Sequence, residues 1–178
     1  MSIEIGSQVV AALENVGISH VVWLPDSALG AWETALVSSR RLRLVRVCRE
    51  GEAWALAAGL HLGGARPLVV MQNTGFFESG DSMRNALFDL GLPLYAIVGY
   101  RSFLLAPAPG EPPADANEPP ARRSRDSACR FTEPVLAAWG VRHVLLTKPD
   151  DLHLFTAHYR ECQQTRQAGI ALWAEGKG

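Results

Sequence analysis

The sequence contains few cysteines and no segment typical of a disulfide framework or a membrane span. Its three cysteines, Cys48, Cys129 and Cys162, are odd in number, and none belongs to a C-x-x-C pair. A reducing compartment is therefore the better interpretation. No apolar run approaches membrane-spanning length, and the first residues lack a basic segment followed by an apolar one. These absences predict a cytoplasmic protein.

The sequence also lacks an excess of either charge. Its net charge of -1 gives no support for binding to nucleic acid or to a membrane surface. Hydrophobic residues make up 48% and charged residues 20% of 178 positions, which is ordinary for a globular protein. The length suits one domain with a sizeable core, so we expect a single domain over residues 1–178.

Several common site motifs are absent. The sequence contains no G-x-G-x-x-G after a strand and no G-x-x-x-x-G-K-[ST], so the usual phosphate cradles are missing. It has no G-x-S-x-G elbow, and its five histidines form no H-E-x-x-H or clustered ligand pattern. No metal ligand is expected in this chain.

Short apolar runs alternate with helical patterns along almost the whole chain. Strand-like runs lie at 20–24, 42–47, 68–71, 94–98, 142–146 and 170–173. Helical patterns lie at 3–16, 28–38, 50–63, 80–90, 132–139 and 149–166. Apolar runs without alternation are typical of strands buried on both faces. The pattern predicts an α/β fold with a doubly wound, mainly parallel six-stranded sheet and helices on both faces.

A Pro-rich segment at 106–121 interrupts this rhythm. Its prolines exclude a helix or a central strand. Two interpretations stay open: a surface loop or extended linker, and a mobile flap over a site.

Polar, turn-forming residues follow the first four predicted strands. The strand ends read Pro25-Asp26-Ser27, Cys48-Arg49-Glu50, Gln72-Asn73-Thr74-Gly75 and Gly99-Tyr100-Arg101. Ligands bind at the carboxyl ends of strands in open parallel sheets, and these ends supply acids, amides, hydroxyls and a guanidinium. Ordinary loops are rich in the same residue types. A binding edge without a phosphate cradle indicates half of a site, with the rest supplied from elsewhere.

Glu50 is the candidate catalytic residue. It stands where a strand gives way to an Ala-rich, nearly uncharged helix, so it is expected to face little water and to bind a proton more readily. Such a group can exchange protons with a heterocycle at neutral pH. The alternative is a helix-start carboxylate stabilised by the helix dipole. Glu52 is the rival acid, but it points about 200° away from Glu50 at about 3.6 residues per turn.

These residues resemble a known family. Glu50, with Ala53 three residues on and Gly59 nine residues on, resembles the glutamate helix of the pyrimidine-binding domain of thiamine-diphosphate enzymes. The stretches similar to phosphonopyruvate and sulfopyruvate decarboxylases are 25–27, 49–51, 57–59, 71–75, 99–101 and 132–136. Together they cover nearly the whole chain.

The resemblance implies an incomplete enzyme. In this family the pyrimidine-binding domain meets a diphosphate-binding domain, which holds Mg²⁺ through a Gly-Asp-Gly segment followed by Asn. The sequence contains no such segment. The implied function is therefore the α subunit of a two-chain, thiamine-diphosphate-dependent 2-oxo acid decarboxylase. Its β subunit would hold Mg²⁺ and the diphosphate, in an α2β2 or larger assembly.

The resemblance also implies roles for the cofactor side of the site. Glu50 would hydrogen-bond N1′ of the aminopyrimidine and favour the imino tautomer that generates the ylide. Asn73, Thr74 and Gly75 would form a loop beside the cofactor rings.

On the substrate side, Asp26, Ser27 and Arg101 would contact the 2-oxo acid. Arg101 suits an anionic tail such as sulfonate or phosphonate. The alternative for the first two is a turn in which Ser27 caps the next helix. This side departs from the family: residues 76–82 replace the usual Leu-Gly-Asn, and no Gln-His pair follows Arg101. A carboligase subunit and a non-catalytic regulatory or scaffold domain stay open as alternative functions.

Overall fold

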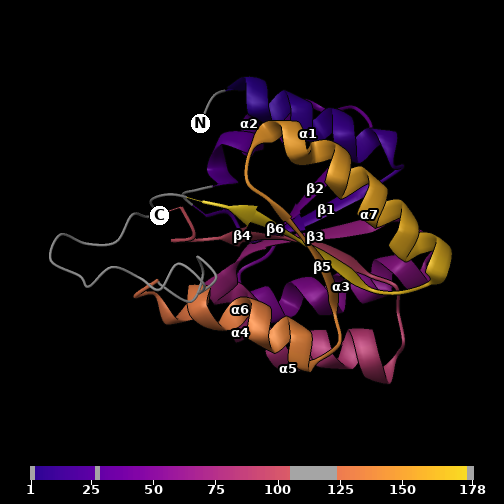
Figure 1. Ribbon diagram of the computed structural model, residues 1–178. Helices are drawn as coiled ribbons and strands as arrows, with labels where there is room; N and C mark the ends of the chain where they lie inside the picture. Colours follow the sequence, from indigo (N-terminus) through magenta and orange to yellow (C-terminus); the bar gives the residue numbers. More distant parts are fainter. Residues whose placement is uncertain (1–2, 27–28, 105–123, 176–178) are drawn as a thin grey trace, which may run out of the picture.

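A computed structural model describes residues 3–26, 29–104 and 124–175. Six strands form one sheet (Figure 1). They are β1 (His20–Trp23), β2 (Arg43–Arg46), β3 (Pro67–Gln72), β4 (Tyr95–Tyr100), β5 (Arg142–Leu146) and β6 (Gly169–Ala174). The order is β2-β1-β3-β4-β6-β5, and every pairing is parallel. The predicted fold class is confirmed, and the sheet is wholly parallel.

Helices cover both faces of the sheet (Figure 1). One face carries α1 (Ile3–Asn15), η1 (Leu29–Trp32), α2 (Glu33–Ser38) and α7 (Leu152–Thr165), the last preceded by η4 (Pro149–Asp151). The other carries α3 (Glu50–Leu62), α4 (Asn73–Glu78), α5 (Gly80–Arg84), the π-helical turn η2 (Asn85–Asp89) and α6 (Ser127–Ala138). No helix within these described ranges is long and apolar enough to cross a membrane.

The central strands are apolar because both of their faces are covered. All six residues of β4 and all six of β6 are buried, whereas the edge strand β2 is only partly buried. Two hydrophobic clusters result, one on each face of the sheet. This arrangement explains the apolar runs without alternation in the sequence.

The helices differ from the predicted ones at several places; the predicted helices 28–38 and 149–166, for example, each begin with a 3-10 helix, η1 and η4. Residues 73–78 form the short helix α4, which the sequence did not predict. Helix α6 begins at Ser127 rather than at residue 132, because the side chain of Asp126 accepts a hydrogen bond from the N–H of Ala128 and caps the helix. The predicted helix 80–90 is divided into α5 and the π-helical turn η2. The Pro-rich segment 106–121 lies outside the described residues.

Candidate functional site at the carboxyl edge

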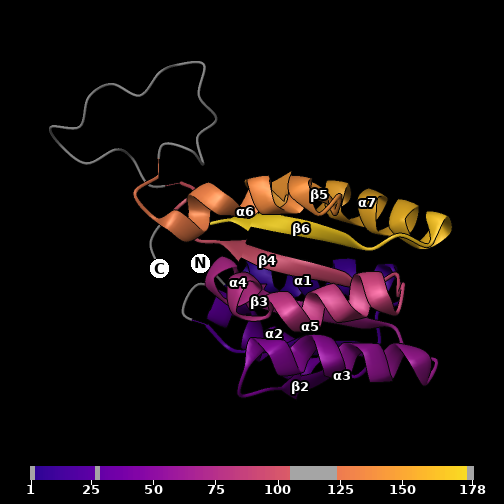
Figure 2. The same cartoon turned by 90° about the horizontal axis from the view of Figure 1, so that it is seen from below.

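The parallel strands bring their carboxyl ends to one edge of the sheet. The register pairs Trp23 of β1 with Val70 of β3, and Gln72 of β3 with Gly99 of β4. Figure 2 shows β4 and β6 side by side, with their arrowheads pointing the same way. The polar residues that follow the strands therefore gather at this edge, as the sequence predicted.

Glu50 and Gly75 lie against each other at this edge. Glu50 is the first residue of α3 and is half-buried, and Gly75 belongs to the first turn of α4. A Cβ built on Gly75 would lie 2.7 Å from Glu50 Cδ, which is closer than real Cβ contacts. A side chain at position 75 would therefore displace the Glu50 carboxyl group from its contact with α4.

Asn73 is buried without a hydrogen bond to its side chain. Its exposed fraction is 0%, and neither its amide nitrogen nor its amide oxygen has a partner among the described residues. Buried amides are normally paired, so this one has unused donor and acceptor capacity. The stretch Asn73-Thr74-Gly75 begins helix α4 and is not the loop that the resemblance implied, because the helical backbone starts directly at the end of β3.

Glu78 anchors the start of α3 and was missed by the sequence analysis. Its Oε1 accepts two hydrogen bonds from Arg49, at 3.1 Å from Nε and 2.6 Å from Nη2. Its Oε2 accepts the backbone N–H of Gly51 at 2.9 Å. These bonds hold the pKa of Glu78 below its usual value. These three hydrogen bonds fix Arg49 and Gly51, the residues on either side of Glu50.

Glu52 faces a different part of the molecule from Glu50. Its Oε2 accepts the backbone N–H of Cys48 at 3.2 Å, and its side chain is exposed. The rival acid is therefore engaged with the chain before α3, whereas Glu50 lies on α4.

Two of the three substrate-side candidates lie at the same edge. The Oδ1 atom of Asp26 accepts the N–H of Leu29 at 2.7 Å and so caps η1. Arg101 follows β4, and its Nε lies 3.6 Å from Asp126 Oδ2 with 46% of the side chain exposed. Ser27 lies outside the described residues.

Glu175, directly after β6, is a further acid at this edge that the sequence analysis missed. It is 5% exposed, and neither carboxyl oxygen has a hydrogen-bond partner among the described residues. Burial, and next the negative charge of Asp26, raise its pKa to about 8, against an opposing effect of Arg101. The sequence did contain a signal for Glu175, because this acid closely follows the sixth apolar run. Only the ends of the first four predicted strands were considered as parts of the site.

The cofactor side of the edge fits the aminopyrimidine that the resemblance implies. A carboxyl group can bond a ring nitrogen, and an unpaired amide can bond an exocyclic amino group or a second ring nitrogen. Glu50 and Asn73 supply these two groups from helices that touch at Gly75. The described residues contain no cluster suited to a metal ion.

Comparison with known proteins identifies relatives among decarboxylases. The chain is 32% identical over 95 residues to a phosphonopyruvate decarboxylase of Streptomyces hygroscopicus, and 30% identical over 95 residues to one of Streptomyces viridochromogenes. Each alignment covers 53% of this chain and 24% of the relative. The chain is also 27% identical over 101 residues to the sulfopyruvate decarboxylase subunit alpha of Methanothermobacter thermautotrophicus. That alignment covers 57% of this chain and 61% of the alpha subunit.

The matches therefore span about a quarter of the two phosphonopyruvate decarboxylases and about three fifths of the alpha subunit. Residues 3–114 match the family described as "Thiamine pyrophosphate enzyme, N-terminal TPP binding domain". This match includes Asp26, Glu50, Asn73 and Gly75, and it covers more than half of the chain. The chain belongs to the thiamine pyrophosphate enzyme family, as its N-terminal TPP binding domain.

Proposed function

We propose that this chain is the α subunit of a two-chain, thiamine-diphosphate-dependent 2-oxo acid decarboxylase. The observation that carries the proposal is the carboxyl group of Glu50 lying on Gly75, next to the helix start that holds the unpaired amide of Asn73. The similarity to a protein named as an alpha subunit, of which this chain matches 61%, favours a separate partner chain.

Glu50 acts on the aminopyrimidine ring. Its carboxyl group hydrogen-bonds N1′ and holds or releases a proton there, which activates the thiazolium C2–H. Asn73, Thr74 and Gly75 bind beside the ring, Gly75 by leaving room for Glu50. When bound, thiamine diphosphate supplies the carbon nucleophile and the electron sink for loss of carbon dioxide.

The substrate side takes a small 2-oxo acid. Asp26 and Ser27 follow β1 and contact the reacting end of the substrate. The exposed guanidinium of Arg101 binds an anionic tail, since a guanidinium pairs well with sulfonate or phosphonate oxygens.

The partner is a β subunit that carries the diphosphate-binding domain. It holds Mg²⁺ and the diphosphate, because the sequence of this chain offers no Gly-Asp-Gly segment. The chain is a single pyrimidine-binding domain, and a site shared between subunits makes α2β2 the smallest natural assembly.

The test is a tagged pull-down from the native host, with the co-purifying protein identified by mass spectrometry. We expect a stoichiometric partner that carries Gly-Asp-Gly followed by Asn. The pair is then assayed with thiamine diphosphate, Mg²⁺ and a panel of pyruvate, sulfopyruvate and phosphonopyruvate. Aldehyde products support the decarboxylase, whereas acyloin products indicate the carboligase. If the chain is recovered without a partner, or with a partner that lacks this segment, the proposal is contradicted and a non-catalytic scaffold domain is favoured.

The chain offers a matched pair of variants for this assay. Glu50→Gln is expected to lower turnover of the pair by at least about 100-fold, the lower limit for loss of a general acid–base group. Glu52→Gln, two residues along the same helix, is expected to retain turnover because Glu52 contacts the Cys48 N–H instead. Equal turnover of the two variants would contradict the role of Glu50.

A further inference from the structure

The end of β6 places a buried acid next to the end of β4, on the substrate side of the edge. The backbone N–H of Glu175 donates to the carbonyl oxygen of Tyr100 at 3.1 Å, and its own carbonyl accepts the N–H of Leu104 at 2.9 Å. These bonds fix Glu175 beside the end of β4. Its side chain lies on Gly99, where a built Cβ would be 3.1 Å from Glu175 Cδ and 3.4 Å from Leu29 Cδ1.

Among the described residues, no hydrogen-bond partner of the Glu175 carboxyl group explains its burial. Neither of its oxygens is hydrogen-bonded among the described residues, although 95% of the residue is buried. A carboxyl group that serves only the fold is normally paired when it is buried, because an unpaired one costs free energy. This acid is retained at a cost to stability, at the edge where the site lies.

Two charged groups act on Glu175 at this edge, and a third lies beside one of them. Asp26, after β1, acts on it with a like charge, and Arg101, after β4, acts with the opposite charge. Oδ2 of Asp126, just before α6, lies 3.6 Å from Arg101 Nε and partly offsets the charge of Arg101. The surroundings therefore favour a neutral carboxyl group, which can donate its proton.

We propose that Glu175 is a catalytic acid of the site and that Asp26 is its charge partner. The proposal rests on the proposed function and adds a residue to its substrate side. A 2-oxo acid decarboxylase must deliver one proton to the carbon that carbon dioxide leaves. Glu175 delivers it.

The proton balance of this step is simple. The bond between the substrate carbonyl carbon and its carboxylate breaks, carbon dioxide leaves, and the electron pair of that bond remains available for a new bond at the substrate carbon. The O–H bond of Glu175 then breaks as a C–H bond forms at that carbon. Glu175, now a carboxylate beside Asp26, regains a proton from water, so each turnover consumes one proton and no oxidant or reductant is needed.

The first arm of the test is a ¹³C NMR titration of the full chain, with glutamate labelled at Cδ. The Glu175 signal is assigned by its loss in Glu175→Gln. We expect its midpoint near pH 8. The midpoint should fall in Asp26→Asn, which removes the like charge, and rise in Arg101→Gln, which removes the opposite one.

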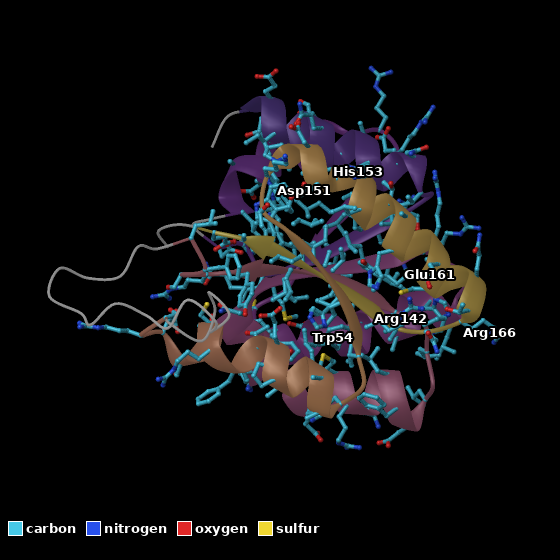
Figure 3. All side chains as sticks on the ribbon, in the orientation of Figure 1. Trp54, Arg142, Asp151, His153, Glu161 and Arg166 are labelled. Atoms are coloured by element: carbon cyan, nitrogen blue, oxygen red, sulfur yellow. The ribbon has the colours of Figure 1, made fainter. Side chains whose placement is uncertain are left out.

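Glu161 serves as the internal control. It is exposed on α7, where it pairs with Arg142 at 2.6 Å, far from the arrowhead of β6 (Figure 3). Its pKa lies below the usual value because of that hydrogen bond, and neither variant should move its midpoint. A Glu175 midpoint at the ordinary pH of about 4 to 5, unmoved by both variants, overturns the proposal.

The second arm uses the pair of subunits with thiamine diphosphate, Mg²⁺ and the 2-oxo acid panel. Glu175→Gln is expected to slow aldehyde formation by about 100-fold, with little change in KM, and to increase the share of acyloin. The share of acyloin increases because the substrate carbon, when it receives no proton, attacks a second carbonyl group. An unchanged aldehyde rate and product ratio overturn the proposal.

The two arms separate this proposal from the proposed function. If the wild-type pair neither binds thiamine diphosphate nor releases carbon dioxide, the proposed function fails, and proton delivery by Glu175 fails with it. If the wild-type pair decarboxylates and Glu175→Gln does so equally well, the proposed function stands and only the catalytic role of Glu175 falls.

Discussion

At the amino end of β4 the buried polar side chains are paired, whereas at the carboxyl ends of β3 and β6 they are not. The hydroxyl of Tyr95 lies 2.6 Å from His158 Nδ1, and His158 Nε2 lies 3.7 Å from Cys162 Sγ. At the other end, Asn73 and Glu175 are buried without a hydrogen bond among the described residues. This cluster at the amino end of β4 is therefore paired, whereas two buried polar side chains at the carboxyl edge have no hydrogen-bond partner among the described residues.

The two ends differ in whether their buried polar groups stabilise the fold. Burial lowers the pKa of His158 and raises that of Cys162, so the paired cluster stays neutral and suits an interior. Unpaired buried groups cost free energy and persist where a ligand or a reaction requires them. The carboxyl edge is the part of this domain in which such groups gather.

The largest expected effect comes from filling the contact between Gly75 and Glu50. Gly75→Ala introduces a Cβ that would overlap the Glu50 side chain, so the carboxyl group must move. Turnover of the proposed two-subunit enzyme should fall by at least about 100-fold, since a misplacement of about 1 Å can cost that much. Steady-state kinetics measures the loss.

Gly80→Ala is the matched control for this prediction. A Cβ there would meet only Trp139, at an ordinary 3.8 Å, so turnover should be retained. A similar loss in both variants would show that a general disturbance of these helices, and not the position of Glu50, lowers the activity.

The next effect concerns the paired end. Tyr95→Phe removes the hydroxyl partner of His158 Nδ1, which is half-buried. We expect the free energy of unfolding to fall by about 1–3 kcal/mol, the usual cost of leaving a buried polar group unpaired. Denaturant unfolding measures the loss, and turnover should be unchanged. If Tyr95→Phe lowered turnover but not stability, the amino end of β4 would serve function and not stability, which contradicts this comparison.

At the carboxyl edge, removing the carboxyl group of Glu175 should raise the free energy of unfolding at high pH, whereas Tyr95→Phe lowers it. Since the pKa of Glu175 is raised to about 8 in the fold, the folded chain holds a proton that the unfolded chain has lost. Stability therefore falls as pH rises from the unfolded pKa of about 4.3 through 8. Glu175→Gln should remove this fall, a relative gain at pH 9 of at least about 1.4 kcal/mol, the equivalent of one pKa unit.

Thermal unfolding of both proteins at pH 5 and pH 9 checks this sign. The comparison is of the change between the two pH values, which cancels effects of the substitution that do not depend on pH. Parallel pH dependence in the two proteins would contradict a raised pKa at Glu175.

The smallest effect tests a partly exposed pair between the start of β5 and helix α6. His143 Nε2 lies 3.6 Å from Glu133 Oε1, and this contact raises the pKa of His143. The pair therefore stabilises the fold below about pH 6.5, and the contribution is lost as pH rises through the folded pKa of His143. His143→Gln should remove less than about 1 kcal/mol at pH 6 and nothing at pH 9, because both groups are partly exposed. An equal loss of the free energy of unfolding at pH 6 and pH 9 would contradict a stabilising pair that depends on the protonation of His143.

Much of the fold was predictable because its signals are local. Each strand is an apolar run bounded by turn residues, and each of the six appears within a few residues of its predicted range. Helix α4 was not predictable in this way, since its six residues follow β3 without a break and include Gly75 and two adjacent phenylalanines, which show no helical period. Its start at Asn73 depends on packing.

The candidate site was predictable where its residues follow a strand closely. Asp26, Glu50 and Asn73 follow the first three strands, and the parallel sheet gathers them at one edge. Glu78 was not predictable, because its bond to the Gly51 N–H joins residues 27 positions apart. Glu175 depends on the adjacency of β4 and β6, which the order of strands along the sequence does not reveal.

The central claim is that Glu50 activates the cofactor at this edge, and exchange of the thiazolium C2 proton tests it most directly. The two-subunit enzyme with bound thiamine diphosphate is mixed with D₂O, quenched with acid at short times, and the remaining C2–H signal is read by ¹H NMR. We predict rapid exchange in the wild type and in Glu52→Gln, and exchange slowed by at least about 100-fold in Glu50→Gln. Equally rapid exchange in Glu50→Gln, with the cofactor still bound, would contradict the account.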